Sequence, residues 1–313
     1  MNKPTHNNTM KLLTTLLSTI VLAASTRGAA FTNNPDADTF ARSNAPTLNY
    51  GAAGALSVSG IYATNETGVK NGAFDSFIRF NTAAMVASFN GVFGPNNWAV
   101  TSAKMVLTES GAPAQAIFNR GKGAFEIRWI ANDIWTEGTG TPTAPTTVGL
   151  AYNNEPSLLN SSSDASLGVF TNAGANATLS FSLGLPAAFT SDLAAGGEVD
   201  LFFTATDPKT GFTFNSQSFG TVSARPFLIV SAWPRPGITG ISLDTTNLTL
   251  TATNGAAGGT YIVLASTNMA LPMLQWTPVA TNVLSAGGNF TMMVTNGASA
   301  SGPAQAFFRL QAQ

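Results

Sequence analysis

Hydrophobic and polar residues alternate along most of the chain, in short runs separated by turn residues. A period of two is typical of a β-strand with one buried face, and β-branched and aromatic residues favour that conformation. The pattern predicts strands at 55–62, 76–80, 102–108, 124–131, 177–183, 198–206 and 226–232. Further strands are predicted at 247–253, 259–267, 274–281, 289–295 and 306–312. The sequence therefore predicts an all-β protein.

The run WPRPG at 233–237 divides the predicted strands into two groups. Two prolines and a glycine end the preceding strand and stiffen the linker that follows. We expect a jelly-roll-like antiparallel β-sandwich over residues 31–233, a Pro-rich linker at 234–237, and a smaller antiparallel β-sandwich over 238–313.

The segments between the strands differ in character. Turn and cap residues predict short helices at 83–89 and 186–195. Two longer segments, 136–149 and 153–176, are rich in Thr, Pro, Gly, Asn and Ser and are expected to lack regular structure. Loops of this length in a compact domain are usually functional or mobile.

Residues 1–30 are predicted to form a secretory signal peptide. Lys11 supplies a positive start, 12–22 a short apolar core, and small residues follow, with cleavage expected after Ala30 or near Ser25. The alternative is an N-terminal membrane anchor, but the apolar core is too short to span a bilayer stably. We expect a secreted, extracellular protein with no membrane attachment after cleavage.

The composition excludes several kinds of chemistry. There is no cysteine, and the single histidine, His6, lies in the predicted signal peptide. A mature chain without either residue has no disulfide, no thiol nucleophile, no Ser-His-Asp triad and no His-ligated zinc. Removing residues 1–30 leaves 11 basic and 15 acidic residues, a net charge of −4. Because nucleic-acid affinity comes from neutralising phosphates, we expect no nucleic-acid partner.

Arg79 lies in the middle of a phenylalanine-rich predicted strand, DSFIRFN at 75–81, in a chain with only 9% charged residues. Alternation places it on one face with Asp75 and Phe77. One interpretation is structural: its guanidinium pairs with a carboxylate and stacks on an aromatic ring. The other is a ligand site, in which the guanidinium fork holds a uronate or sulfate group.

Three further residues are candidates for the same ligand site. Arg128 is the natural companion of Arg79, and this pair of arginines becomes a stronger candidate if both lie on one face of the sheet. The alternative for Arg128, which alternation places on a face with Glu126, is a cross-strand Glu-Arg ion pair. Trp135 opens the Thr-rich loop, where an aromatic ring can pack on the apolar face of a sugar. Tyr50 can act in the same way. The alternative for both aromatics is packing in the core.

Acidic residues suggest two other kinds of site. Asp36 and Asp38 lie two apart, and a structural calcium there is one hypothesis, because hard cations take several oxygen ligands. Glycosidase or lyase chemistry without histidine would need paired carboxylates, or Tyr, Arg or Lys for β-elimination, and Asp133 and Glu137 are the best carboxylate pair available. The alternative for that pair is capping of the strand end and loop.

Several segments together resemble the DNRLRE domain family, which is related to disaggregatase-type carbohydrate-binding modules. They cover roughly residues 34–232, and two positions depart from the family pattern: Asn81 stands where an aspartate is common, and the preceding segment lacks an arginine often seen there. The matching segments are DADTF (36–40), LNYGAAGALSV (48–58), FIRFN (77–81), VTSAKMVLT (100–108), WTEGT (135–139) and ARPFLIV (224–230).

Residues 238–313 are similar to a C-terminal β-domain of large secreted proteins of Verrucomicrobia and Planctomycetes. The two resemblances imply a jelly-roll sandwich, a bacterial extracellular protein and contact with glycans. They do not imply catalysis.

These observations favour a secreted, non-catalytic carbohydrate-binding protein, with an extracellular or cell-wall polysaccharide or a cell-surface glycan as its partner. A structural or adhesive matrix protein without a defined sugar site is the main alternative. A polysaccharide-degrading enzyme with a carboxylate or Tyr/Lys mechanism is the third hypothesis, and a deep cleft holding two acids about 5–9 Å apart would favour it.

Overall fold

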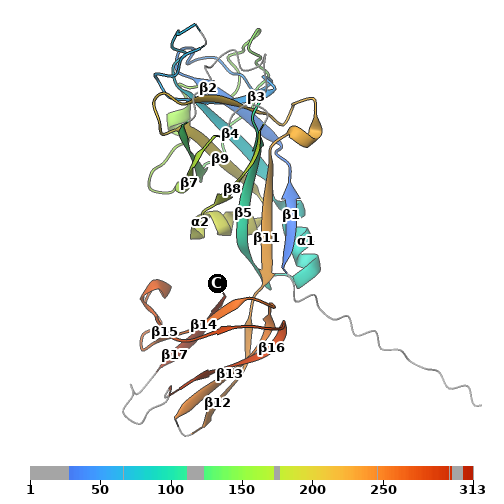
Figure 1. The fold of residues 1–313 in the computed structure, drawn as a ribbon, viewed down its shortest axis with the longest axis vertical. Coiled ribbons are helices and arrows are strands. Elements are labelled where there is room, and N and C mark those ends of the chain that lie inside the picture. The colour runs from blue at the N-terminus through green and yellow to red at the C-terminus, as the bar shows by residue number, and fades with distance from the viewer. Residues whose placement is uncertain are drawn as a thin grey trace, which may run out of the picture.

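The computed structural model describes residues 28–65, 67–110, 123–172, 177–244, 246–295, 297 and 306–312 (Figure 1). These residues form antiparallel sheets arranged as sandwiches, which confirms the predicted all-β fold. The predicted signal peptide falls almost wholly on residues 1–27, outside the described part of the chain. No described helix combines the length and hydropathy that crossing a membrane requires.

Two sheets make up the larger sandwich (Figure 1). The four-stranded sheet has the order β1 (Ala29–Asn33), β11 (Phe227–Pro234), β5 (Trp98–Thr108), β8 (Thr178–Leu183). The seven-stranded sheet has the order β10 (Gly211–Asn215), β3 (Ala55–Ser59), β4 (Phe74–Asn81), β9 (Glu198–Ala205), β6 (Ala124–Ile130), β7 (Ala165–Thr171). Its seventh strand, β2 (Ala37–Arg42), pairs antiparallel with β4.

The main core lies between these two sheets and is rich in phenylalanine. Phe80 of β4 faces it from one sheet, and Met105 of β5 faces it from the other. Phe125 of β6 meets Phe181 edge-on, with ring centroids 5.3 Å apart, and Phe212 at 5.1 Å. Such tilted pairs add to the stabilisation that burial of the rings provides.

Both expected helices are present, and both contribute to the main core. α1 (Ala83–Phe93) buries Met85 and Phe89, and α2 (Ala187–Ala195) buries Phe189 and Leu193. Gly196 ends α2 in the left-handed conformation with φ 79°, as its sequence position suggested. Three short 3₁₀ helices also occur: η1 (Glu155–Ser157), η2 (Val222–Ala224) and η3 (Met273–Gln275).

The C-terminal region forms a smaller sandwich of two three-stranded sheets. One has the order β12 (Gly237–Asp244), β13 (Asn247–Gly255), β16 (Gly288–Val294), and the other β15 (Thr277–Val283), β14 (Thr260–Ser266), β17 (Phe307–Ala312). Leu250, Tyr261, Val263 and Met292 are buried between them. Tyr261 is fully buried, and its hydroxyl accepts a hydrogen bond from the backbone N–H of Ala256 at 2.6 Å.

Five strands lie where the alternation predicts none: β1, β2, β7, β10 and β12. β7 corrects the expectation that 153–176 lacks regular structure; pairing with β6, a long-range contact, fixes it as a strand. β1 includes Ala29 and Ala30, which pair with Ala232 and Ser231 of β11. Cleavage of a signal peptide after Ala30 would remove two paired residues, whereas an earlier cleavage leaves the strand whole.

Candidate functional site

The outer face of the seven-stranded sheet, which points away from the main core, is covered by the segment between β6 and β7. We call this segment, residues 131–164, the loop cap. A second apolar cluster joins it to the sheet: Phe77 and Phe202 point out from β4 and β9 and meet side chains of the cap. The cap side chains in this cluster are Trp135, Leu150, Leu158 and Leu159. The two long loops are therefore packed against the sheet over a small core of their own.

Asn49 fixes the path of the loop cap. Its side chain is fully buried and donates to the carbonyls of Glu137 at 2.7 Å and Leu150 at 2.9 Å. Its amide oxygen accepts the backbone N–H of Gly140 at 3.1 Å. Gly138 has φ 79°, and a Cβ there would lie 2.2 Å from that amide oxygen, so the close approach requires glycine. One asparagine thus satisfies backbone groups from both halves of the cap.

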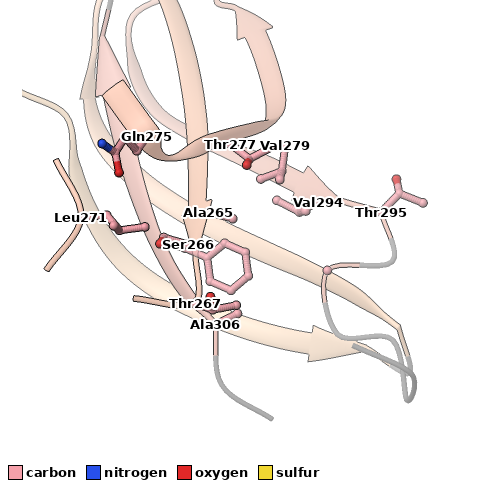
Figure 2. A pocket seen from close by; sticks show the side chains of 12 residues that line it. Ala265, Ser266, Thr267, Leu271, Gln275, Thr277, Val279, Val294, Thr295 and Ala306 are labelled. Carbon is pink, nitrogen blue, oxygen red and sulfur yellow. The ribbon is translucent and has the colours of Figure 1, made fainter. Parts of the chain in front are cut away.

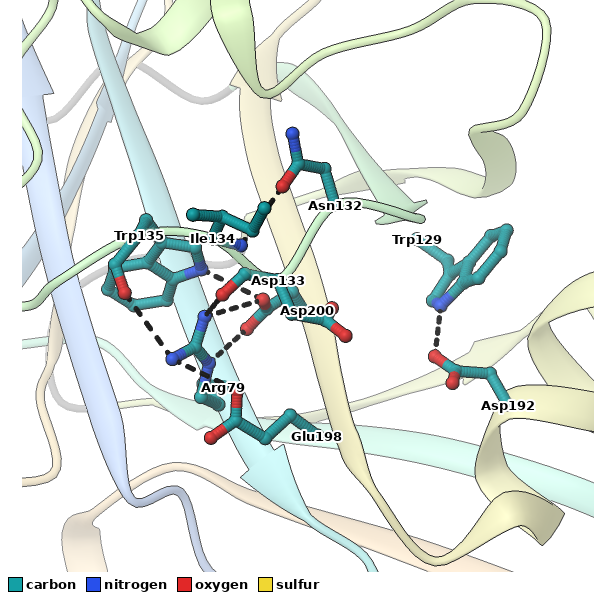
Figure 3. Close-up of polar contacts among 9 residues, drawn as sticks. All are labelled: Arg79, Trp129, Asn132, Asp133, Ile134, Trp135, Asp192, Glu198 and Asp200. Atoms are coloured by element: carbon teal, nitrogen blue, oxygen red, sulfur yellow. Dashed lines mark hydrogen bonds and ion pairs between the residues drawn. The ribbon is translucent and has the colours of Figure 1, made fainter.

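Arg79 lies beneath the cap and has four kinds of partner (Figure 3). Its Nε and Nη2 each donate to a different carboxylate oxygen of Asp200 at 3.0 Å, and Nη1 pairs with Glu198 at 3.2 Å. It also donates to the backbone carbonyls of Asp133 and Trp135. The guanidinium carbon lies 4.6 Å from the Trp135 ring centroid. Arg79 is only 9% exposed, so the structural interpretation fits the geometry, and this guanidinium has no free fork for an anionic sugar.

Asp200 is the buried counterpart of Arg79 and is 0% exposed. Burial raises the pKa of its carboxyl, and the hydrogen bonds and charge of Arg79 act in the opposite direction. The indole N–H of Trp135 donates to the same carboxylate at 2.9 Å. Strands β4 and β9 and the start of the cap are therefore held by one charged cluster.

Arg128 shares the outer face with Arg79, as the alternation allowed. Both flank β9 in register, Arg79 opposite Asp200 and Arg128 opposite Phe202. The two ion pairs in the described part of the chain both belong to Arg79, so the cross-strand Glu-Arg pair that was the alternative for Arg128 is not formed there. The Arg128 Nε is buried and has no hydrogen-bond partner among the described residues.

Trp135 and Tyr50 correct the expectation that these rings present a face to a sugar. Trp135 is 8% exposed, because Arg79 and the apolar cluster cover it. Tyr50 is 3% exposed and stacks on Phe40 with centroids 4.7 Å apart. Both rings pack in satellite cores, which was the alternative interpretation. Residue type alone did not distinguish the two, since aromatics favour both settings.

The acidic residues proposed as pairs do not converge on each other. Asp38 is buried and its carboxylate accepts the backbone N–H of Gln217, while Asp36 lies near Glu198 and Arg79. The Glu137 carboxylate accepts from the Asp38 N–H at 3.0 Å and the Gln217 side chain at 2.8 Å, away from the Arg79 cluster where Asp133 lies. The expected calcium pair and the expected catalytic pair are thus each split between different partners.

A different carboxyl pair, which sequence reasoning missed, lies at the interface between sheet and cap. Asp75 of β4 is 6% exposed, and Glu155 of η1 in the cap is 7% exposed. Burial raises the pKa of Asp75 to about 6 while a hydrogen bond with Thr204 lowers it; burial and the nearby Asp75 raise the pKa of Glu155 to about 8. Both carboxyls also raise the pKa of Tyr152, after burial. Only the placement of Asp75 on the face of Arg79 was readable from the sequence.

A surface hollow of about 260 Å³ opens on the loop cap. Trp135, Leu150 and Leu158 are among its lining residues, although each is less than a tenth exposed, and Thr136, Asn154 and Ser157 contribute polar groups. Ile134 and Val148, which are 86% and 70% exposed, also line it. The hollow combines apolar surface with hydroxyl and amide groups on a segment anchored by Asn49 and Arg79.

The smaller sandwich carries a second hollow, of about 530 Å³, which is open and contains no charged side chain (Figure 2). It is lined by Leu271, Val279, Val294, Phe308, several Ser and Thr residues and Gln275. Residues 298–305, next in the chain to its lining residue Gly297, lie outside the described part. The hollow on the loop cap is lined wholly by one continuously described segment, and we take it as the candidate site.

Comparison with known proteins gives no family assignment. No protein-family model and no curated protein sequence matches the chain. Among solved structures, a β-glucuronidase of Ruminococcus gnavus is 9% identical with a TM-score of 0.23, and one of Dictyoglomus thermophilum is 9% identical with a TM-score of 0.26. Each alignment covers 85% of this chain and 38% of the other.

A β-1,2-glucanase of Parabacteroides distasonis is 10% identical with a TM-score of 0.22, over 92% of this chain and 34% of the other. The chain spans less than half the length of these enzymes. TM-scores this low do not establish a shared fold, so the similarities carry no inference about activity.

Proposed function

We propose that the chain is a secreted, non-catalytic carbohydrate-binding protein whose larger sandwich binds a polysaccharide at the hollow on the loop cap. The observation that carries the proposal is the lining of that hollow. Sugar rings present apolar C–H faces and polar edges, and ligand sites combine apolar walls with a few placed polar groups. Its volume, about 260 Å³, suits one sugar ring of a longer chain.

Two sequence features also support the proposal. The resemblance of residues 34–232 to the DNRLRE family implies contact with glycans, and the pattern of residues 1–30 is typical of a signal peptide. The smaller sandwich then serves as an attachment or spacing module.

The test measures binding of the purified full chain to a panel of neutral and acidic polysaccharides. New reducing ends, which report cleavage of the polysaccharide, are measured in the same wells. We expect binding without release of product. Val148→Ala should weaken binding at least threefold, and Ile134→Ala/Val148→Ala at least tenfold, because both side chains line the hollow. Val222→Ala is the matched control, since Val222 is also 70% exposed and lies outside the hollow.

Three results would contradict the proposal. Product release would indicate an enzyme, and absence of binding to any glycan would favour the structural or adhesive alternative. Equal binding by the double variant and the control would place the sugar site elsewhere on the molecule.

A further inference from the structure

Asp75 and Glu155 are enclosed at the interface between the seven-stranded sheet and the loop cap without a cationic partner. Each is less than a tenth exposed. The two ion pairs in the described part of the chain both use Arg79, which is committed to Asp200 and Glu198. Burying an ionised carboxylate without a partner is costly, and two neighbouring carboxylates repel each other as well.

Glu155 gives a second, independent indication. Its Oε2 atom is buried and has no hydrogen-bond partner among the described residues. Buried polar atoms are nearly always paired, so the unpaired carboxylate oxygen beside a second buried carboxyl has room for a partner that the described residues do not supply. The other cap glutamate, Glu137, differs in this respect, because the Asp38 N–H and the Gln217 amide donate to its carboxylate.

We propose that Asp75 and Glu155 bind a hard divalent cation, with calcium as the preferred ion, and that this ion fastens the loop cap to the seven-stranded sheet. Calcium takes six to eight oxygen ligands, including carboxylates, hydroxyls, carbonyls and water, in flexible geometry. No three Asp, Glu, His or Cys side chains converge in the described part of the chain. Neutral oxygens must therefore complete the shell. The hydroxyl of Thr204, which hydrogen-bonds with Asp75, and that of Tyr152, whose pKa both carboxyls raise, are candidates.

This site has a different position from the pair first suggested by the sequence, Asp36 and Asp38, whose carboxyls have other partners. It is also distinct from the hollow on the cap, whose lining includes neither carboxyl. A site with two carboxylates should bind weakly, on the order of 10⁻⁴–10⁻³ M, as extracellular calcium modules do.

The test uses the full chain after removal of divalent ions with EDTA. Calorimetric titration with CaCl₂ should show one site, and 10 mM CaCl₂ should raise the melting temperature by several degrees, whereas NaCl of equal ionic strength should not. MgCl₂ should act more weakly, because Mg²⁺ gives up its water reluctantly. Glu155→Gln and Asp75→Asn should each weaken calcium binding at least tenfold, while Glu137→Gln should leave it unchanged.

Glu155→Gln keeps the shape of the side chain and removes a repulsive charge, so without calcium it should fold at least as well as the wild type. This separates loss of the ion from loss of the fold. Absence of calcium binding by the wild type would overturn the proposal, and so would full calcium binding by Glu155→Gln. No glycan is used in these measurements, so their outcome is independent of the sugar-binding proposal.

Discussion

Ile78 and Phe80 point from β4 into the main core, whereas Phe77 and Arg79 point from the same strand toward the loop cap. The inner residues meet apolar side chains and rings. The outer residues meet a small apolar cluster surrounded by carboxyls, and Arg79 is the cation that forms ion pairs there. Alternate positions of one strand are thus stabilised by different forces. The inner face should respond to volume changes, and the outer face to pH and ions as well.

The largest effect is expected on the inner face. Phe80 is 0% exposed, and Phe80→Ala should destabilise the protein by about 3–5 kcal/mol, because the ring leaves a cavity that its neighbours fill only in part. Urea denaturation gives the free energy of unfolding, and the loss should be similar at pH 5 and pH 8. Val222→Ala, at an exposed position, should change stability little. A loss that depended strongly on pH would mean that the two faces are not independent.

Arg79→Met, on the opposite face of the same strand, should cost about 3–5 kcal/mol at neutral pH, because it leaves the Asp200 carboxylate buried without its cation. The pKa of Asp200 then rises further, so the folded variant holds a proton that the unfolded chain has lost. Stability of the variant is therefore lost as pH rises, and its deficit relative to wild type should grow from pH 5 to pH 8.

The double variant Arg79→Met/Asp200→Leu sharpens this test. Replacing a buried ion pair with apolar residues is often neutral or stabilising, so the double variant should recover most of the stability lost in the single one. If Arg79→Met and the double variant were equally unstable, the contacts of Arg79 with Trp135 and the Asp133 carbonyl would account for the loss instead.

Local patterns were enough to predict the elements on which the inner face depends. Period-two alternation located β4, β5, β6, β9 and β11, and it placed Arg79 on the face of its strand that also carries Asp75 and Phe77. The 186–195 helix was predicted from Pro186 and Gly196, whose backbone preferences are local. These features need no knowledge of which distant segments meet.

The outer face depends on contacts that no local pattern encodes. Asn49 reaches the Leu150 carbonyl 101 positions along the chain, and Arg79 reaches Asp200 over 121 positions. The sequence of the loop cap shows neither the two-residue period of a strand nor the 3.6-residue period of a helix. The burial of Trp135 and Glu155 in the cap could therefore not be predicted. A tryptophan at a loop start is equally compatible with an exposed platform and a buried anchor, and only the fold decides between them.

A moderate effect on the pH dependence of stability is expected from Asp38 of β2, whose backbone N–H donates to Glu137 of the cap. Burial raises the pKa of Asp38 to about 8, with Glu137 adding to the shift. A raised pKa in the folded state means that its contribution to stability is present at low pH and is lost as pH rises toward 8. Between pH 5 and pH 8 the wild type should lose about 1–3 kcal/mol, and Asp38→Asn should reduce that slope while still accepting the Gln217 N–H.

Stability curves from urea denaturation at several pH values test this. Asp207→Asn, at the hairpin where that carboxylate accepts the Lys209 N–H, is the control and should keep the wild-type slope. An unchanged slope in Asp38→Asn would assign the pH dependence of stability to other carboxyls.

The smallest expected effect comes from Trp129, an inner-face residue with one polar contact. Its indole N–H donates to Asp192 of α2 at 2.7 Å (Figure 3), and Trp129→Phe should cost about 0.5–1.5 kcal/mol through loss of that bond. Burial raises the pKa of Asp192 and the indole N–H lowers it, so acid should protonate Asp192 and weaken the bond. The cost of Trp129→Phe should therefore fall between pH 7 and pH 4, and in an Asp192→Ala background, which has no side-chain acceptor, it should be small at both. A cost independent of pH and of Asp192 would show that the indole acts by packing alone.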